Sequence, residues 1–227
     1  MLPIGTFINA AFVLVGGSLG LILHSRFSPK IRLIVFQALG LTTFLIGTQM
    51  SLKVENLIIV ALSLIVGGIL GAMANLEDRC NGLGDWVKRK LKSSHDGFTE
   101  GFVTASLLFC VGAMAILGSF EEGLQGGRTI LITKGILDGF AAAAFATTLG
   151  PGVLLSVLPL ILYQGSLTLF AGQLQPFFSD FLINQMTAIG GLLILGISLN
   201  LLEIKQVKVI NLLPSLLIVV ILSFFFH

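Results

Sequence analysis

The chain has 227 residues, of which 55% are hydrophobic and 11% charged, and its mean hydropathy is +1.01. Soluble domains carry about 25% charged residues, so this composition excludes a soluble globular domain and indicates an integral membrane protein. The formal net charge of +2 is too small to indicate nucleic acid binding. Two cysteines, Cys80 and Cys110, do not make a disulfide framework.

The first part of the chain contains three apolar segments, each long enough to cross a hydrocarbon core of about 30 Å. They cover residues 4–23, 31–52 and 57–74, and the first lacks the basic region of a signal peptide, so we expect it to be retained as a span. The longest polar stretch, 75–96, follows. Its apolar side chains recur at helical spacing, which predicts a short amphipathic helix at the membrane surface; they are Leu83, Trp86, Val87 and Leu91.

Five further apolar segments follow, at 98–116, within 130–149, and at 152–170, 181–202 and 207–225. We expect an acidic, glycine-rich loop at 119–128. The fifth segment is the least regular, because its uninterrupted part begins only near Ile136. A re-entrant fifth segment would leave seven crossings instead of eight.

Loop charges favour eight crossings with both termini outside. In that topology the cytoplasmic loops hold ten of the 13 basic residues, as the positive-inside rule requires. A re-entrant fifth segment would place Lys205 and Lys208 outside. The ten are Arg26, Lys30, Arg32, Arg79, Lys88, Arg89, Lys90, Lys92, Lys205 and Lys208.

Two segments resemble each other. Glu100-Gly101-Phe102 and Asp138-Gly139-Phe140 each open an apolar run, and Gly112 and Gly150 follow their acids at the same distance. A second match relates 37–47 in span two to 185–196 in span seven. Together they pair spans one to three with six to eight, and span four with five. Each pair would cross in opposite directions, which predicts an inverted repeat of the kind found in transporters.

Lys134 and Asp138 are four residues apart, so they share one helical face and could form an ion pair. An ionisable group at the bilayer centre costs about 2.5–3.5 kcal/mol and is rare unless it pairs or serves a transport path. One interpretation is a coupling-cation or proton site at Asp138, modulated by Lys134. The alternative places both at headgroup level, where Asp138 complements the positive end of its helix. Glu100 is a second candidate of the same kind.

Gly150-Pro151-Gly152 interrupts the segment that begins at Lys134. A broken backbone at membrane depth survives only where protein or a water-filled cavity surrounds it. The break is either functional, exposing carbonyl and N–H groups to an ion, or a tight turn between spans five and six. The candidate residues for binding a substrate or ion are Glu100, Thr104, Ser106, Gly112, Lys134, Asp138, Thr147, Thr148, Gly150, Pro151 and Gly152. Three amides, Asn9, Gln164 and Gln185, either line a pathway or join helices.

Several of these stretches carry a family resemblance. The opening LPIGTFIN, the run GFVTASLLFCVGAM from Gly101, KGILDG from Lys134 and YQG from Tyr163 resemble bacterial YqgA/YdfK-type membrane proteins, domain-of-unknown-function family 554. The resemblance covers essentially the whole chain. It implies a bacterial plasma-membrane protein of about seven or eight spans, and it implies no activity.

The sequence therefore predicts an all-α, polytopic transmembrane helical bundle of about eight spans, with an inverted-topology repeat and discontinuous or re-entrant helices. We expect one transmembrane domain over 1–227. It would comprise spans one to three (1–74), a cytoplasmic amphipathic loop (75–96), the central acid-Gly-Phe helix pair (97–152) and spans six to eight (153–227).

The first functional hypothesis is a secondary transporter of a small solute or ion, with its site where the 100–112 and 138–152 segments meet. An oligomeric channel, and a scaffold or sensor acting through the 75–96 loop, are the alternatives. We expect no enzymatic activity, cofactor or metal site, because no catalytic or metal-ligand spacing is present. The expected partners are membrane lipid and an unidentified small solute or ion. A homodimer is left open, and nucleic acid is not expected.

Overall fold

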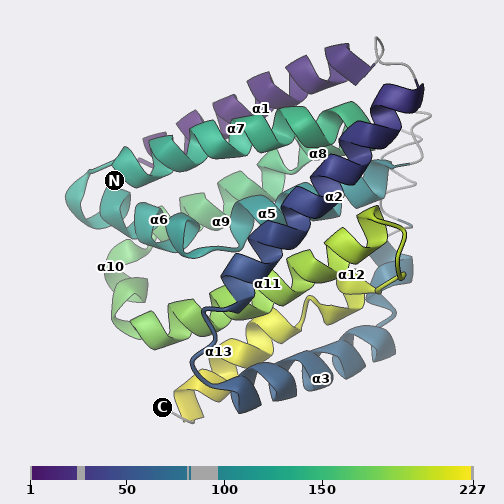
Figure 1. The fold of residues 1–227 in the computed structure, drawn as a ribbon. Helices are drawn as coiled ribbons and strands as arrows, with labels where there is room; N and C mark the ends of the chain where they lie inside the picture. The colour runs from purple at the N-terminus through teal and green to yellow at the C-terminus, as the bar shows by residue number, and fades with distance from the viewer. Residues whose placement is uncertain (1, 25–28, 81, 83–96, 226–227) are drawn as a thin grey trace. The chain divides into compact units, whose positions relative to one another are not determined.

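The structure is a computed structural model that describes residues 2–24, 29–80, 82 and 97–225. Its described secondary structure is helical throughout, as the composition predicts (Figure 1). The predicted amphipathic helix around Trp86 lies outside the described residues.

Five described helices or helix pairs are long and apolar enough to cross a membrane. A sixth is formed if α5 and α6 count as one bent span, and two shorter apolar segments remain. These eight segments coincide with the eight predicted from the sequence; how many of them cross stays a prediction. The first five are α1 (Ile4–His24), α2 (Pro29–Ser51), α7 (Thr129–Leu149), α8 with α9 (Gly152–Leu155 and Val157–Leu169) and α11 (Asp180–Leu201). The others are α5 with α6 (Phe98–Cys110 and Ala113–Gln125), α3 (Leu57–Met73), and α12 with α13 (Val209–Leu212 and Ser215–Phe225).

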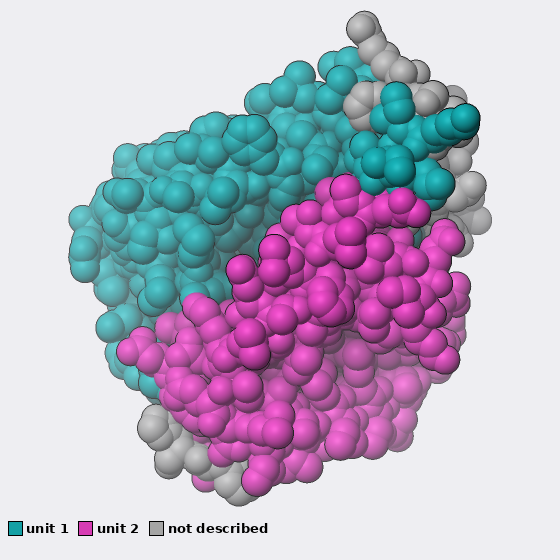
Figure 2. Space-filling model, viewed as in Figure 1, with its two compact units in different colours: residues 1–35, 95–179 teal, residues 36–94, 180–227 magenta. Residues whose placement is uncertain are grey.

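The helices gather into two compact units (Figure 2). Unit 1 comprises Met1–Val35 and His95–Ser179, and unit 2 comprises Phe36–Ser94 and Asp180–His227. Unit 1 also contains the short helix α10 (Ala171–Leu174) and the 3-10 turn η1 (Gln175–Phe177).

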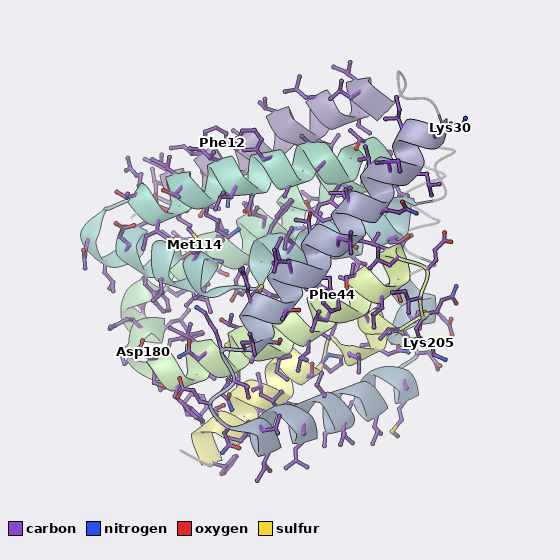
Figure 3. The ribbon with its side chains drawn as sticks, viewed as in Figure 1. Phe12, Lys30, Phe44, Met114, Asp180 and Lys205 are labelled. Carbon is purple, nitrogen blue, oxygen red and sulfur yellow. The ribbon has the colours of Figure 1, made fainter. Side chains whose placement is uncertain are left out.

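Helices α1 and α7 form the closest pair in unit 1, and they run parallel along their whole length (Figure 1). Small residues make this approach feasible. A Cβ atom at Gly16 would lie 2.0 Å from the carbonyl oxygen of Gly139, and one at Gly20 would lie 2.2 Å from that of Ala143. Phe12, labelled in Figure 3, lies against Gly139 through its carbonyl and Cβ and against Gly135 through its ring. Any larger side chain at Gly16 would push the two backbones apart.

Helix α5 runs antiparallel to α7. At one end, a Cβ atom at Gly101 would lie 2.9 Å from the Cβ of Leu149. At the other end, the Nζ of Lys134 lies 5.9 Å from the centre of the Phe109 ring. The C-terminal end of α5 therefore reaches the part of α7 that carries the predicted ion pair.

The helix that begins at Phe98 differs from the expected single span of 98–116. Val111 is extended, with φ −94° and ψ 109°, and α6 then leaves at an angle of 56° to α5. Helix α6 continues to Gln125, so the loop expected at 119–128 is wrong over most of its length. Gly126 then ends the helix in the left-handed conformation that glycine favours.

Unit 2 packs α2 antiparallel to α11, and α3 antiparallel to α13, again through glycines. A Cβ atom at Gly47 would lie 2.8 Å from the backbone nitrogen of Leu195, and one at Gly67 would lie 2.4 Å from that of Ser215. The side chain of Asn56 caps α3 by accepting the N–H groups of its first turn. The helices of unit 2 therefore pack closely through glycines, and a hydrogen-bonded cap fixes the start of α3.

Candidate functional site

The ion pair that the four-residue spacing predicts is present near the middle of α7. Lys134 Nζ donates to Asp138 Oδ2, and the two side chains are 7% and 10% exposed. A buried charge without its partner would be strongly destabilising, so each residue requires the other. The pair therefore forms the centre of the candidate site.

Two buried amides extend this pair into a polar cluster. Asn9 Nδ2 on α1 donates to Asp138 Oδ2 at 3.0 Å and to Gln164 Oε1 on α9 at 3.3 Å. Both amides are fully buried. Even so, Asn9 Oδ1 and Gln164 Nε2 have no partner within the described part of the chain. The cluster thus holds one acceptor and one donor whose bonding capacity is unused.

The interruption between α5 and α6 adjoins the ion pair. The Phe109 ring lies beside the Lys134 ammonium, with its centre 5.9 Å from Nζ. A helix end leaves carbonyl groups, and a helix start leaves N–H groups, without partners in their own helix. The carbonyl end of α5 and the N–H end of α6 therefore meet at this interruption, and the Phe109 side of it lies beside Lys134.

The other acidic candidate is not part of this cluster. Glu100 is exposed in the first turn of α5, and that turn packs beside Leu149 at the far end of α7. Eleven residues of helix separate Leu149 from Asp138, which is roughly 16 Å along the axis. Between these ends, Thr104 is buried and Ser106 Oγ has no partner among the described residues.

The Gly150-Pro151-Gly152 break also lies at that far end, where it joins α7 to α8. Gly150 has φ 77° and ψ −156°, a conformation that only glycine adopts readily. A Cβ atom at Gly152 would lie 1.9 Å from the carbonyl oxygen of Phe98, so the turn is packed directly on α5. Thr147 and Thr148 donate to carbonyls of their own helix. This geometry is that of the tight-turn alternative, and it does not bring the break to Asp138.

Gln185 belongs to unit 2 and has a different environment from the other two amides. Its Oε1 accepts the N–H groups of Glu55 and Asn56 at 3.0 and 3.3 Å, and its Nε2 donates to the carbonyl of Asn56 at 3.0 Å. Gln185 therefore fastens α11 to the turn between α2 and α3. This is the joining role that the sequence left open for it.

Glu122 is a buried acid in the segment 119–128, for which the sequence predicts a loop. It is 1% exposed on α6 and accepts the N–H of Gly5, in the first turn of α1, at 2.6 Å. Arg128 Nε lies 3.2 Å from the same oxygen. Continuing the helical spacing from Ala115 through Ser119 to Glu122 would have predicted this burial.

The described residues contain no group of three or more His, Cys, Asp or Glu side chains that could hold a metal ion. The polar cluster instead offers amide and carboxylate oxygens, which suit hard cations or the polar groups of a small solute.

A family model described as "Protein of unknown function (DUF554)" matches residues 4–224. The chain belongs to the DUF554 family. It is 38% identical over 227 residues to the uncharacterized membrane protein YdfK of Bacillus subtilis (strain 168), with 98% of this chain and 96% of YdfK covered. It is 34% identical over 225 residues to the uncharacterized protein YqgA of Escherichia coli (strain K12), with 97% and 96% covered. No solved structure matches the chain.

Family membership confirms the resemblance noted in the sequence, and the name of YdfK agrees with the apolar helices in describing a membrane protein. These names carry no activity. In this DUF554 protein, the feature that bears on function is the polar cluster of Asn9, Lys134, Asp138 and Gln164.

Proposed function

We propose that this chain is a secondary transporter of a small solute or ion across the bacterial plasma membrane. Its central site is the polar cluster of Lys134 and Asp138 with Asn9 and Gln164. The observation that carries the proposal is a buried ion pair whose amide neighbours keep one acceptor and one donor without a partner among the described residues. Both termini are placed outside, as the loop charges favour.

The physical argument concerns the cost of unused polar groups. An amide buried without a full set of hydrogen bonds costs free energy in any apolar environment, and most of all in lipid. A residue that only joins helices has no reason to bear that cost. A residue that exchanges bonds with a passing solute does, because the solute supplies the missing partner. Intramembrane ionisable residues serve substrate and ion pathways for the same reason.

The packing within each unit supports the inverted repeat that the proposal uses. The sequence matches pair α1 with α8–α9, α2 with α11, α3 with α12–α13, and α5–α6 with α7. Each of these pairs packs antiparallel, as shown by contacts such as Gly17 with Leu154 and Gly40 with Leu202. Helices α1 and α7 run parallel, as eight crossings require of spans one and five. Antiparallel, matched helices around a central site are the usual construction of secondary transporters.

The test compares cells that lack the protein with cells that express it as wild type or as Asp138→Asn. The measurement is the cellular content of metabolites and inorganic ions. We expect a difference with the wild type and none with Asp138→Asn, although both insert to the same level. Asp180→Asn is the matched control, because Asp180 is exposed in the first turn of α11 (Figure 3). An Asp138→Asn protein that changes the content as the wild type does would remove Asp138 from the mechanism.

Transport kinetics and single-channel recordings distinguish a carrier from a channel. A carrier saturates with substrate, and its rate is limited by a conformational step on the microsecond to second timescale. Single-channel currents across a planar bilayer would instead support the channel hypothesis.

A further inference from the structure

The buried polar groups of unit 1 continue beyond the central cluster. Among the described residues, Thr6 Oγ1, Thr168 Oγ1 and Glu122 Oε2 are also buried and without a partner. Thr6 precedes Asn9 by three residues on α1, and Thr168 follows Gln164 by four on α9, so each lies close to the same helical face as its amide. The two threonines thus extend the cluster in one direction along both helices.

That direction leads to Glu122. Glu122 accepts the N–H of Gly5, next to Thr6, and a Cβ atom at the neighbouring Gly123 would lie 2.4 Å from the carbonyl oxygen of Thr168. Gly5 and Asn9 are one helical turn apart, roughly 6 Å along α1. Glu122 and Asp138 are therefore both held against the first two turns of α1, with the two threonines beside them.

The charges along this line alternate. Glu122 is buried and paired with Arg128, whose side chain is 40% exposed, so the pair connects the buried carboxylate to the surface of unit 1. Lys134 precedes Asp138 on α7, and because α7 runs parallel to α1, it lies on the same side of Asp138 as Glu122 does. The unpartnered atoms between the two carboxylates are mostly oxygens, which are the ligands of hard cations.

The structural alternative is that Glu122 only caps α1, since an anion stabilises a helix N-terminus. Capping accounts for the bond to Gly5. It does not account for the second carboxylate oxygen, nor for the buried hydroxyls of Thr6 and Thr168. None of these three groups has a partner in the part of the chain that the structure describes.

Building on the proposed function, we propose that Glu122, Thr6 and Thr168 form an access route by which a small hard cation such as Na⁺ reaches Asp138. Glu122 attracts the cation at the outer end of the route, just beneath Arg128, which competes with the cation for that carboxylate. The threonine hydroxyls and the amide oxygens then replace part of the hydration shell. At the inner end the cation competes with the Lys134 ammonium for Asp138.

The first test is thiol accessibility in a background of Cys80→Ala and Cys110→Ala. We expect Thr6→Cys and Thr168→Cys to react with a small cationic methanethiosulfonate about tenfold faster than a buried cysteine with no route to it. Na⁺ should slow the reaction, and choline should not. Ser63→Cys is the matched control, because Ser63 on α3 is equally buried and also lacks a partner among the described residues. Equal, slow labelling at all three positions would overturn the route.

The second test uses the two members of the outer pair in opposite senses, with Na⁺ protection of Thr6→Cys as the readout. Glu122→Gln keeps an oxygen for the N–H of Gly5 while removing the charge, so it should lower the apparent Na⁺ affinity about tenfold. Arg128→Gln removes the competing cation and should raise that affinity. An unchanged affinity in either variant would overturn the role of Glu122.

These outcomes are separate from those of the transport test. If Asp138→Asn abolishes the cellular effect but Thr6→Cys stays unreactive, the transporter stands and the route is wrong. If Thr6→Cys is protected by Na⁺ but expressing the wild-type protein leaves the cellular content as in cells that lack it, the cation route stands and the transport assignment fails.

Discussion

Gln164 in unit 1 and Gln185 in unit 2 are both fully buried amides, yet their surroundings differ. Gln185 uses both of its polar atoms on the backbone of the turn between α2 and α3. Gln164 accepts one bond from Asn9 and leaves its Nε2 without a partner in the described structure. Burial alone therefore does not reveal the role of an amide. What separates a helix-joining amide from a candidate binding group is whether its hydrogen-bonding capacity is already used.

The largest loss of stability is expected when the ion pair of the unit 1 cluster is broken. Lys134→Met leaves the Asp138 carboxylate buried without its cation, and breaking a buried pair on one side costs about 3–5 kcal/mol. We expect that loss in the free energy of unfolding, measured by denaturant titration in detergent micelles. The double variant Lys134→Met/Asp138→Leu should recover most of it, because no unpaired charge remains. If Lys134→Met were as stable as the wild type, the Lys134–Asp138 ion pair would not be holding the cluster together.

The next effect tests the joining role of Gln185. Gln185→Leu leaves two N–H groups and one carbonyl in the 55–56 turn without their partner. We expect a loss of about 1–3 kcal/mol, because water reaches this turn and replaces part of the bonding. Amide hydrogen exchange at Glu55 and Asn56 should rise in parallel. Unchanged exchange there would mean that Gln185 does not hold the turn, and the contrast with Gln164 would disappear.

A loss of stability of similar size is expected at the turn between α7 and α8. Gly150 has a positive φ that other residues adopt only under strain, so Gly150→Ala should destabilise the protein by about 1–3 kcal/mol. Gly172→Ala is the control, because a Cβ atom there meets nothing within 4 Å and no positive φ is present. If Gly150→Ala also abolished transport without lowering stability, the break would have a functional role beyond that of a turn.

The smallest effect on stability is expected at Gln164. Gln164→Leu removes one accepted bond and one unpartnered donor, so we expect a change in unfolding free energy near zero, well below that of Gln185→Leu. Its effect on transport should nevertheless be large if the free donor serves the substrate. A strongly destabilised Gln164→Leu would show that Gln164 joins helices as Gln185 does.

Most of the helices could be predicted from the sequence, because the apolar segments are long and the thickness of the membrane sets their length. Their positions agree with the helices at both ends of the chain, from Ile4 to Phe225. The ion pair of Lys134 and Asp138 also followed directly, since its spacing is local. The interruption at Val111 did not, because β-branched residues and glycine are common within membrane helices that stay straight.

The composition of the candidate site was harder to predict. Asn9, Asp138 and Gln164 come from three helices, and only their packing shows that they share bonds that Gln185 does not. Glu100 was chosen because its neighbours resemble those of Asp138, yet local similarity carries no information on depth along a helix. Glu122 was missed because a glutamate pair followed by glycines is typical of loops. Its burial depends on the contact with Gly5, far away in the sequence.

The proposed transport function depends on binding of the transported species by the Asp138 cluster. The most direct test is gradient-driven uptake into proteoliposomes of the compound or ion identified in the cellular comparison. We predict saturable uptake by the wild-type protein and by Asp180→Asn, and none by Asp138→Asn reconstituted to the same folded fraction. Undiminished uptake by Asp138→Asn would contradict the account.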